Sequence, residues 1–142
     1  MSPEREVAVY WDASAVVAAL FRDPHSHRAQ TWARRAGVHL VSTLAWAEVY
    51  AVIARIEREH ALSRIFVAAA RDALEDGMWR RVNAAPEWRL IRDLSLRWRL
   101  RGADLWHLAT AKSLQNELPE LKLLSFDARL VAAARGEGIG TK

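Results

Sequence analysis

Short apolar runs alternate with longer amphipathic stretches along the chain. Glu6–Trp11 is a short run of β-branched and aromatic residues, a composition that favours a strand. Val38–Val41 and Leu121–Phe126 have the same character, as does Met78–Val82, whose two arginines suit the edge of a sheet. Strands that alternate with helices form parallel βαβ units with helices on both faces of the sheet. We therefore expect an α/β fold, a three-layer α/β/α sandwich with a mainly parallel central sheet.

The segments between these strands carry apolar residues at helical spacing. Glycines, prolines and capping residues such as Ser42 and Thr43 mark where these helices begin and end. The tail 136–142 holds three glycines and is expected to be a frayed edge strand. The predicted helices cover residues 13–22, 25–36, 44–60, 62–76, 86–101, 104–116 and 128–135.

Length and composition fit one globular domain over residues 1–142, with 51% hydrophobic and 27% charged residues. The chain has no cysteine, which excludes disulfides, thiolate metal sites and cysteine nucleophiles. No apolar run approaches the roughly 18 residues that a membrane span requires. The first residues carry charges of both signs, unlike a signal peptide. We expect a cytoplasmic protein with no membrane partner.

The positive charge of the chain is concentrated in one segment. The formal net charge is +4, and seven arginines lie between Arg80 and Arg101 against only two acidic residues. Local basicity of this kind is what a nucleic-acid contact requires. A solvated helix face in an arginine-rich protein would look the same, so both interpretations stay open.

Four acidic residues occupy positions where the predicted fold would bring them together. Asp12 and Asp127 each follow a strand, Asp104 opens a helix, and Glu48 lies among apolar and aromatic residues one turn into another helix. Parallel strands present their carboxyl ends at one edge of a sheet. Because clustered carboxylates cannot all ionise unaided, a divalent cation is the natural partner. Oxygen ligands alone favour Mg²⁺ or Mn²⁺, which usually act on phosphates.

A purely structural role is the alternative for each acid taken alone. Asp12, Asp104 and Asp127 could cap the helices that follow them. His107 lies three residues after Asp104, on the same helix face. A metal ligand or a proton shuttle is conceivable there, but a packed histidine with one hydrogen bond is the favoured interpretation.

Each of the four acids lies in its own short sequence motif. An apolar strand leads into Asp-Ala-Ser; a glutamate follows Ser-Thr early in a helix; an aspartate opens a helix containing histidine and small residues; and a strand ends in Ser-x-Asp. These segments are Val9–Ser14, Ser42–Val49, Leu100–Ala111 and Leu123–Leu130. In order and spacing they resemble the PIN domains, in particular the small VapC-type toxin ribonucleases of prokaryotic toxin–antitoxin pairs.

This resemblance implies a metal-dependent endoribonuclease that uses Mg²⁺ or Mn²⁺ to hydrolyse RNA with an activated water. It also implies a type II toxin–antitoxin system, with a cognate antitoxin protein as partner. Ser14 and Ser125 would support the site through hydrogen bonds. The implied catalytic and metal-binding residues are the four acids, Asp12, Glu48, Asp104 and Asp127.

Other side chains are expected at surfaces. Arg101 and Arg129, close to the acids in sequence, and Trp46, which flanks Glu48, are candidate RNA contacts. Two helices carry more apolar surface than a small sheet can cover, which suggests a homodimer or an antitoxin groove rather than an ordinary core. The residues of this excess are Val52, Ile56, Ile65 and Phe66.

Two functions of other classes remain open from the sequence. A phosphatase could use Asp12 as its nucleophile, although such enzymes usually carry a second aspartate two residues on, where this chain has Ser14. A non-catalytic, PIN-like RNA-binding domain is the other alternative, and the presence of all four acids argues against it.

Overall fold

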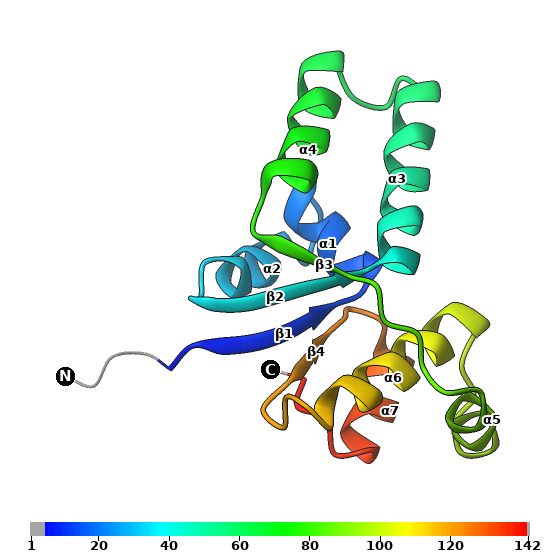
Figure 1. Ribbon diagram of the computed structural model, residues 1–142. Coiled ribbons are helices and arrows are strands. Elements are labelled where there is room, and N and C mark those ends of the chain that lie inside the picture. The colour runs from blue at the N-terminus through cyan, green and yellow to red at the C-terminus, as the bar shows by residue number, and fades with distance from the viewer. Residues whose placement is uncertain (1–4, 142) are drawn as a thin grey trace.

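The computed structural model describes residues 5–141, in which strands and helices alternate along the chain (Figure 1). The strands are β1 (Val7–Trp11), β2 (Gly37–Ser42), β3 (Trp79–Val82) and β4 (Lys122–Leu124). The helices are α1 (Ala13–Leu20), α2 (Ser26–Ala33), α3 (Thr43–Arg58), α4 (Arg64–Asp76), α5 (Trp88–Arg97), α6 (Gly102–Gln115) and α7 (Ala128–Gly136).

The four strands form one parallel sheet in the order β3-β2-β1-β4. Strand β1 is central, and its Tyr10 lies opposite Leu40 on β2 and Leu123 on β4. Strand β3 lies at an edge, as its two arginines predicted. The expected α/β fold is thus confirmed. Because every pairing is parallel, the carboxyl ends of the strands lie at the same edge of the sheet.

The sheet separates two apolar cores, because alternate residues of a strand point to opposite faces. Val9 and Trp11 of β1 belong to one core, together with residues of α1, α3 and α4. Ala8 and Tyr10 belong to the other, together with residues of α6 and α7. Helices α1–α4 cover one face and α5–α7 the other (Figure 1). Burying each large apolar side chain stabilises the fold by about 1.5–3 kcal/mol.

A buried histidine joins the two central strands. The indole N–H of Trp11 donates to Nδ1 of His39 over 3.0 Å, and Nε2 of His39 lies 2.8 Å from the carbonyl oxygen of Arg35. A carbonyl only accepts, so Nε2 carries the proton and Nδ1 is the free acceptor. His39 is therefore neutral and satisfied at both nitrogens, although only 3% of it is exposed.

The helix predicted over residues 86–101 is wrong at its C-terminal end. Helix α5 stops at Arg97, Trp98 is extended, and α6 begins at Gly102. The indole N–H of Trp98 donates to Oε2 of Glu137 over 2.8 Å. Its ring lies so close to Gly136 that a Cβ there would come within 2.2 Å of it. This long-range contact overrides the local helix propensity of residues 98–101.

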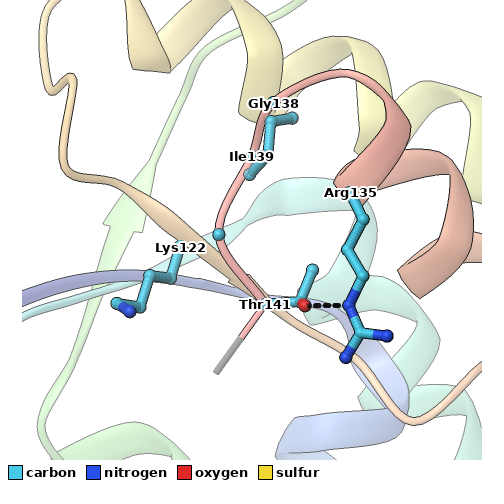
Figure 2. A pocket seen from close by; sticks show the side chains of 6 residues that line it. Lys122, Arg135, Gly138, Ile139 and Thr141 are labelled. Carbon is cyan, nitrogen blue, oxygen red and sulfur yellow. Dashed lines mark hydrogen bonds between the residues drawn. The ribbon is translucent and has the colours of Figure 1, made fainter.

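The tail after α7 forms less strand than predicted. Gly140 makes a single parallel bridge to Lys122, at the start of β4. Figure 2 shows Arg135 turned toward the tail, where its Nε donates to Thr141 Oγ1 over 2.9 Å. Residue 142, the last of the predicted tail, lies outside the described residues.

Helices α3 and α4 form a hairpin that projects from the sheet (Figure 1). On α4, Ile65 is 79% exposed and Phe66 is 63% exposed. Val52 and Ile56 on α3 are half-buried, and Ile56 packs against the core. The predicted apolar excess is therefore concentrated on α4. Among the described residues, no helix is long and apolar enough to cross a membrane.

Candidate active site

Asp12 lies directly after β1 and is only 3% exposed. Its Oδ1 accepts hydrogen bonds from the Ala15 N–H over 2.9 Å and from Ser14 Oγ over 2.7 Å. The capping role considered from the sequence is thus present, since Asp12 is the N-cap of α1. Burial raises the pKa of Asp12, and hydrogen bonds from Ser125, Ser14 and the Ala15 amide oppose that rise. The carboxyl group is held in place but poorly solvated.

The two serines connect the first and last segments of this site. Ser14 Oγ accepts from the N–H of Phe126 over 3.0 Å, while it donates to Asp12. Ser125 Oγ accepts from the N–H of Asp127 over 3.0 Å. Ser14 therefore holds the loop after β4 against the end of β1, and Ser125 fixes the backbone of Asp127 within that loop.

Glu48 lies on the second turn of α3, whose N-cap is Ser42. His107 on α6 places Nε2 2.9 Å from Oε1 of Glu48 and Nδ1 2.6 Å from the hydroxyl of Tyr10. His107 is 1% exposed and Tyr10 is fully buried, and burial raises the pKa of Tyr10. His107 is thus packed in the core, as the favoured interpretation has it, but with a polar partner at each ring nitrogen.

Asp104 lies in the first turn of α6, not at its cap, so the capping alternative is wrong for this residue. Burial raises the pKa of Asp104 most, and the charges of Asp127, Asp12 and Glu48 raise it further. The four predicted acids therefore share one electrostatic field. Such mutual repulsion is what a bound cation would relieve.

Asp127 is the N-cap of α7, as the sequence allowed. Its Oδ1 accepts from the N–H groups of Arg129 and Leu130, each over 3.0 Å. Asp127 and Asp104 line one open pocket together with Arg101 and Arg129. Two of the predicted RNA contacts thus border two of the predicted acids.

Some arginines of the segment 80–101 are paired with acidic side chains of the chain itself. Arg81 forms an ion pair with Glu75, and Arg97 with Glu137. The guanidinium of Arg81 also lies 4.2 Å from the ring centroid of Trp46, which packs against Tyr50 on its own helix. Part of the Trp46 ring is therefore already covered by the chain itself.

The chemistry of the donor set fits a hard divalent cation, because it consists of carboxylate oxygens. Within residues 5–141, however, no three His, Asp or Glu side chains lie close enough together to hold a metal ion. The hydrogen bonds explain this spacing, since Glu48 is turned to His107 and Asp12 to the start of α1. The carboxylates would have to turn toward one another to share a cation.

Two features of this region were not predicted from the sequence. Tyr10 lies within the predicted strand Glu6–Trp11, and its bond to His107 depends on the pairing of distant segments. The rings of His25 and Phe126 stack at the edge of the site, with centroids 4.5 Å apart and an angle of 7° between the planes. The sequence places His25 at the start of the predicted helix 25–36 and gives its side chain no role.

Comparison with known proteins gives one family. The family model described as PIN domain matches residues 9–136. No curated protein sequence matches the chain. Among solved structures, VapC20 of Mycobacterium tuberculosis, described as a Sarcin-Ricin loop cleaving toxin, is similar with a TM-score of 0.60 and 16% identity, over 89% of this chain and 95% of that chain. PAE2754 from Pyrobaculum aerophilum is similar with a TM-score of 0.58 and 17% identity, over 92% of this chain and 81% of that chain.

Proposed function

The chain belongs to the PIN domain family, and from this premise we propose that it is a metal-dependent endoribonuclease. The observation that carries the proposal is the pocket that Asp104 and Asp127 line together with Arg101 and Arg129. There the charges of Asp127, Asp12 and Glu48 add to burial in raising the pKa of Asp104. Four acids from distant segments share one field at one edge of the sheet. Repulsion among these carboxylates destabilises the metal-free fold, and a bound divalent cation would relieve it.

Asp12, Glu48 and Asp104 would hold Mg²⁺ or Mn²⁺, and Asp127 would contribute directly or through a water. When bound, the ion would lower the pKa of a water and offset charge on the scissile phosphate. Ser14 fixes one oxygen of Asp12, and His107 fixes one oxygen of Glu48. These neighbours orient the carboxylates, as hydrogen-bond partners of metal ligands generally do.

Arg101 and Arg129 would hold the RNA backbone. They border the same pocket as Asp104 and Asp127, so a phosphate bound by them would lie beside the acids. Guanidinium groups suit this task because they offer paired donors to phosphate oxygens. The proposed substrate is therefore RNA that reaches the pocket through its phosphates, in the cytoplasm where RNA is abundant.

The proposed biological role is that of the toxin in a type II toxin–antitoxin pair. The similarity in fold to VapC20 supports it. An apolar groove between α1 and α4 includes Leu20, Phe21, Leu62 and Phe66. We propose that an antitoxin segment or a second copy of the chain covers this apolar surface.

The phosphatase alternative is weaker in view of the geometry. Asp12 is buried, and its Oδ1 is occupied by two hydrogen bonds, which leaves a poor nucleophile. Neither of two lysines is placed to stabilise a phosphorylated Asp12. Lys112 forms an ion pair with Glu137, and Lys122 lies at the opposite end of β4 from Asp12. An RNA-cleavage assay distinguishes the ribonuclease from the non-catalytic RNA-binding domain, which would bind RNA without cutting it.

The chemistry of the product ends tests the proposal. Attack by a metal-activated water leaves a 5′-phosphate and a 3′-hydroxyl, whereas attack by the ribose 2′-hydroxyl leaves a 2′,3′-cyclic phosphate. We expect RNA fragments with 5′-phosphates when the purified protein is incubated with Mg²⁺ or Mn²⁺, and none with EDTA. Cyclic phosphate ends, or cleavage that persists in EDTA, would contradict the proposal.

A further inference from the structure

The stacked rings of His25 and Phe126 lie beside the acidic site. Phe126 separates Ser125 from Asp127 in the sequence, and its backbone N–H donates to Ser14 Oγ over 3.0 Å. Ser14 in turn donates to Asp12 over 2.7 Å. Two hydrogen bonds thus connect the backbone that carries the Phe126 ring to a proposed catalytic carboxylate. A nucleotide bound next to a phosphate at the acids would pass close to these rings.

The side chain of His25 does not cap the helix that follows it. His25 is the N-cap residue of α2, a position where Ser, Thr, Asp or Asn is preferred. Its imidazole makes no capping hydrogen bond, whereas its backbone N–H donates to Asp23 Oδ1 over 2.7 Å and its carbonyl accepts from the N–H of Ala29 over 3.0 Å. The ring is exposed, so the stack covers one face and leaves the rest to solvent.

A cation accompanies the stacked rings. The guanidinium of Arg28, one turn further along α2, lies 5.5 Å from the centroid of the Phe126 ring. Arg28 is exposed. Proteins commonly bind single-stranded nucleic acids with an aromatic surface next to a guanidinium group. The bases stack on the rings and a phosphate contacts the cation.

From these observations we propose that His25 and Phe126 form a stacking platform for an unpaired base of the RNA substrate, with Arg28 holding a neighbouring phosphate. The inference rests on the proposed function, which it deepens. Stacking tolerates any base because every base has a π face. The platform therefore selects single-stranded RNA or loops over duplex, and does not read a sequence.

Binding of RNA without cleavage tests the platform. A fluorescein-labelled single-stranded RNA is titrated with the whole chain in EDTA, and fluorescence anisotropy gives the Kd while a gel confirms that the RNA stays intact. We expect His25→Ala to raise the Kd about tenfold, within the range measured for loss of one stacked base. His27→Ala, another exposed histidine of α2, should leave the Kd unchanged. His25→Tyr should restore binding, because a phenol ring stacks as well as an imidazole.

Fully base-paired RNA of the same sequence is the second substrate. Its bases are already stacked in the duplex, so His25→Ala and the unaltered chain should bind it equally. The platform is overturned if His25→Ala binds single-stranded RNA as tightly as the unaltered chain, if the loss is the same on duplex RNA, or if the chain binds no single-stranded RNA. Circular dichroism confirms that each variant is folded.

The platform and the proposed function fail separately. If the chain never cleaves RNA with Mg²⁺ or Mn²⁺ but His25→Ala still weakens binding of single strands, the ribonuclease falls and the platform stands. If the chain cleaves RNA and His25→Ala changes neither the Kd nor the positions of the cuts, the ribonuclease stands and the platform falls.

Discussion

Nε2 of His107 lies 2.9 Å from Oε1 of Glu48, a contact that joins α6 to α3 at the proposed site. An ionised carboxylate only accepts, so Nε2 carries a proton toward Glu48. Nδ1 of the same ring lies 2.6 Å from the hydroxyl of Tyr10. A buried chain of three residues thus holds Glu48 from the side away from solvent.

Replacing His107 should weaken metal binding without removing any acid. His107→Phe keeps an aromatic ring of similar size but offers no donor to Glu48. We expect the Kd for Mn²⁺, measured by calorimetry, to rise about 10- to 100-fold, the usual effect of losing a hydrogen-bond partner of a metal ligand. Tyr10→Phe, which only frees Nδ1, should have a smaller effect in the same direction. An unchanged Kd in folded His107→Phe would show that the contact does not position Glu48.

Removing the charge of Asp104 should stabilise the metal-free protein at neutral pH. Burial and the nearby acids raise the pKa of Asp104 in the folded state. A carboxyl whose pKa is raised by folding stabilises the fold at low pH, and this contribution is lost as the pH rises through the folded pKa. In EDTA at pH 7, Asp104→Asn should therefore raise the free energy of unfolding, by at most about 1 kcal/mol because the group is partly exposed to solvent.

This gain should shrink as the pH falls toward 3.8, the ordinary pKa of an aspartate. Saturating Mn²⁺ should reverse the order of stability, because a ligand that binds only the folded state stabilises it. Asp93→Asn, an exposed residue of α5, is the matched control and should show neither effect. Urea unfolding measures both variants. If Asp104→Asn is less stable than the unaltered chain in EDTA, the repulsion inferred here is wrong.

Glu137 should have the opposite pH dependence. Burial raises its pKa, but hydrogen bonds from Lys112 and Trp98 and the charges of Lys112 and Arg97 outweigh burial, so the net pKa is lowered. Stability from a lowered pKa is present at neutral pH and is lost as the pH falls through the folded pKa. We expect Glu137→Gln to cost about 2 kcal/mol at pH 7, because it leaves cations around a neutral group.

The same change should cost much less once Glu137 is protonated, which urea unfolding at several pH values would reveal. Glu117→Gln, an exposed glutamate after α6, should be neutral throughout. A loss for Glu137→Gln that is the same at every pH would show that the ion pairs are not the cause.

Arg101 should contribute to RNA affinity through charge. Each phosphate contact releases counterions, so log K falls with log of the salt concentration with a slope of about −0.9 per contact on duplexes and about −0.7 on single strands. Arg101→Gln should weaken RNA binding and reduce this slope by about one contact. Arg58→Gln, at the far end of α3, should change neither. Equal slopes for Arg101→Gln and the unaltered chain would remove Arg101 from the interface.

The part of the site that follows strands could be predicted from the sequence. Asp12 and Asp127 come directly after short apolar runs, and a parallel sheet brings such positions to one edge. The end of α5 could not be predicted, because Trp98 leaves the helix to pack on Gly136 of α7. The bond from Tyr10 to His107 and the stacking of His25 on Phe126 could not be predicted either. Each contact joins segments that are far apart in the sequence and meet only in the folded protein.

Cleavage of a mixed RNA pool, with Mg²⁺ or Mn²⁺ and with EDTA, shows whether the chain is a metal-dependent ribonuclease. Asp12→Asn, purified in parallel, controls for contaminating ribonuclease, and Asp93→Asn is the matched surface control. We expect metal-dependent cuts by the unaltered chain and by Asp93→Asn. For Asp12→Asn we expect a loss of at least about 100-fold in rate, equivalent to about 2.7 kcal/mol of transition-state stabilisation. Equal cleavage by Asp12→Asn and the unaltered chain would show that the chain is not a ribonuclease that depends on Asp12.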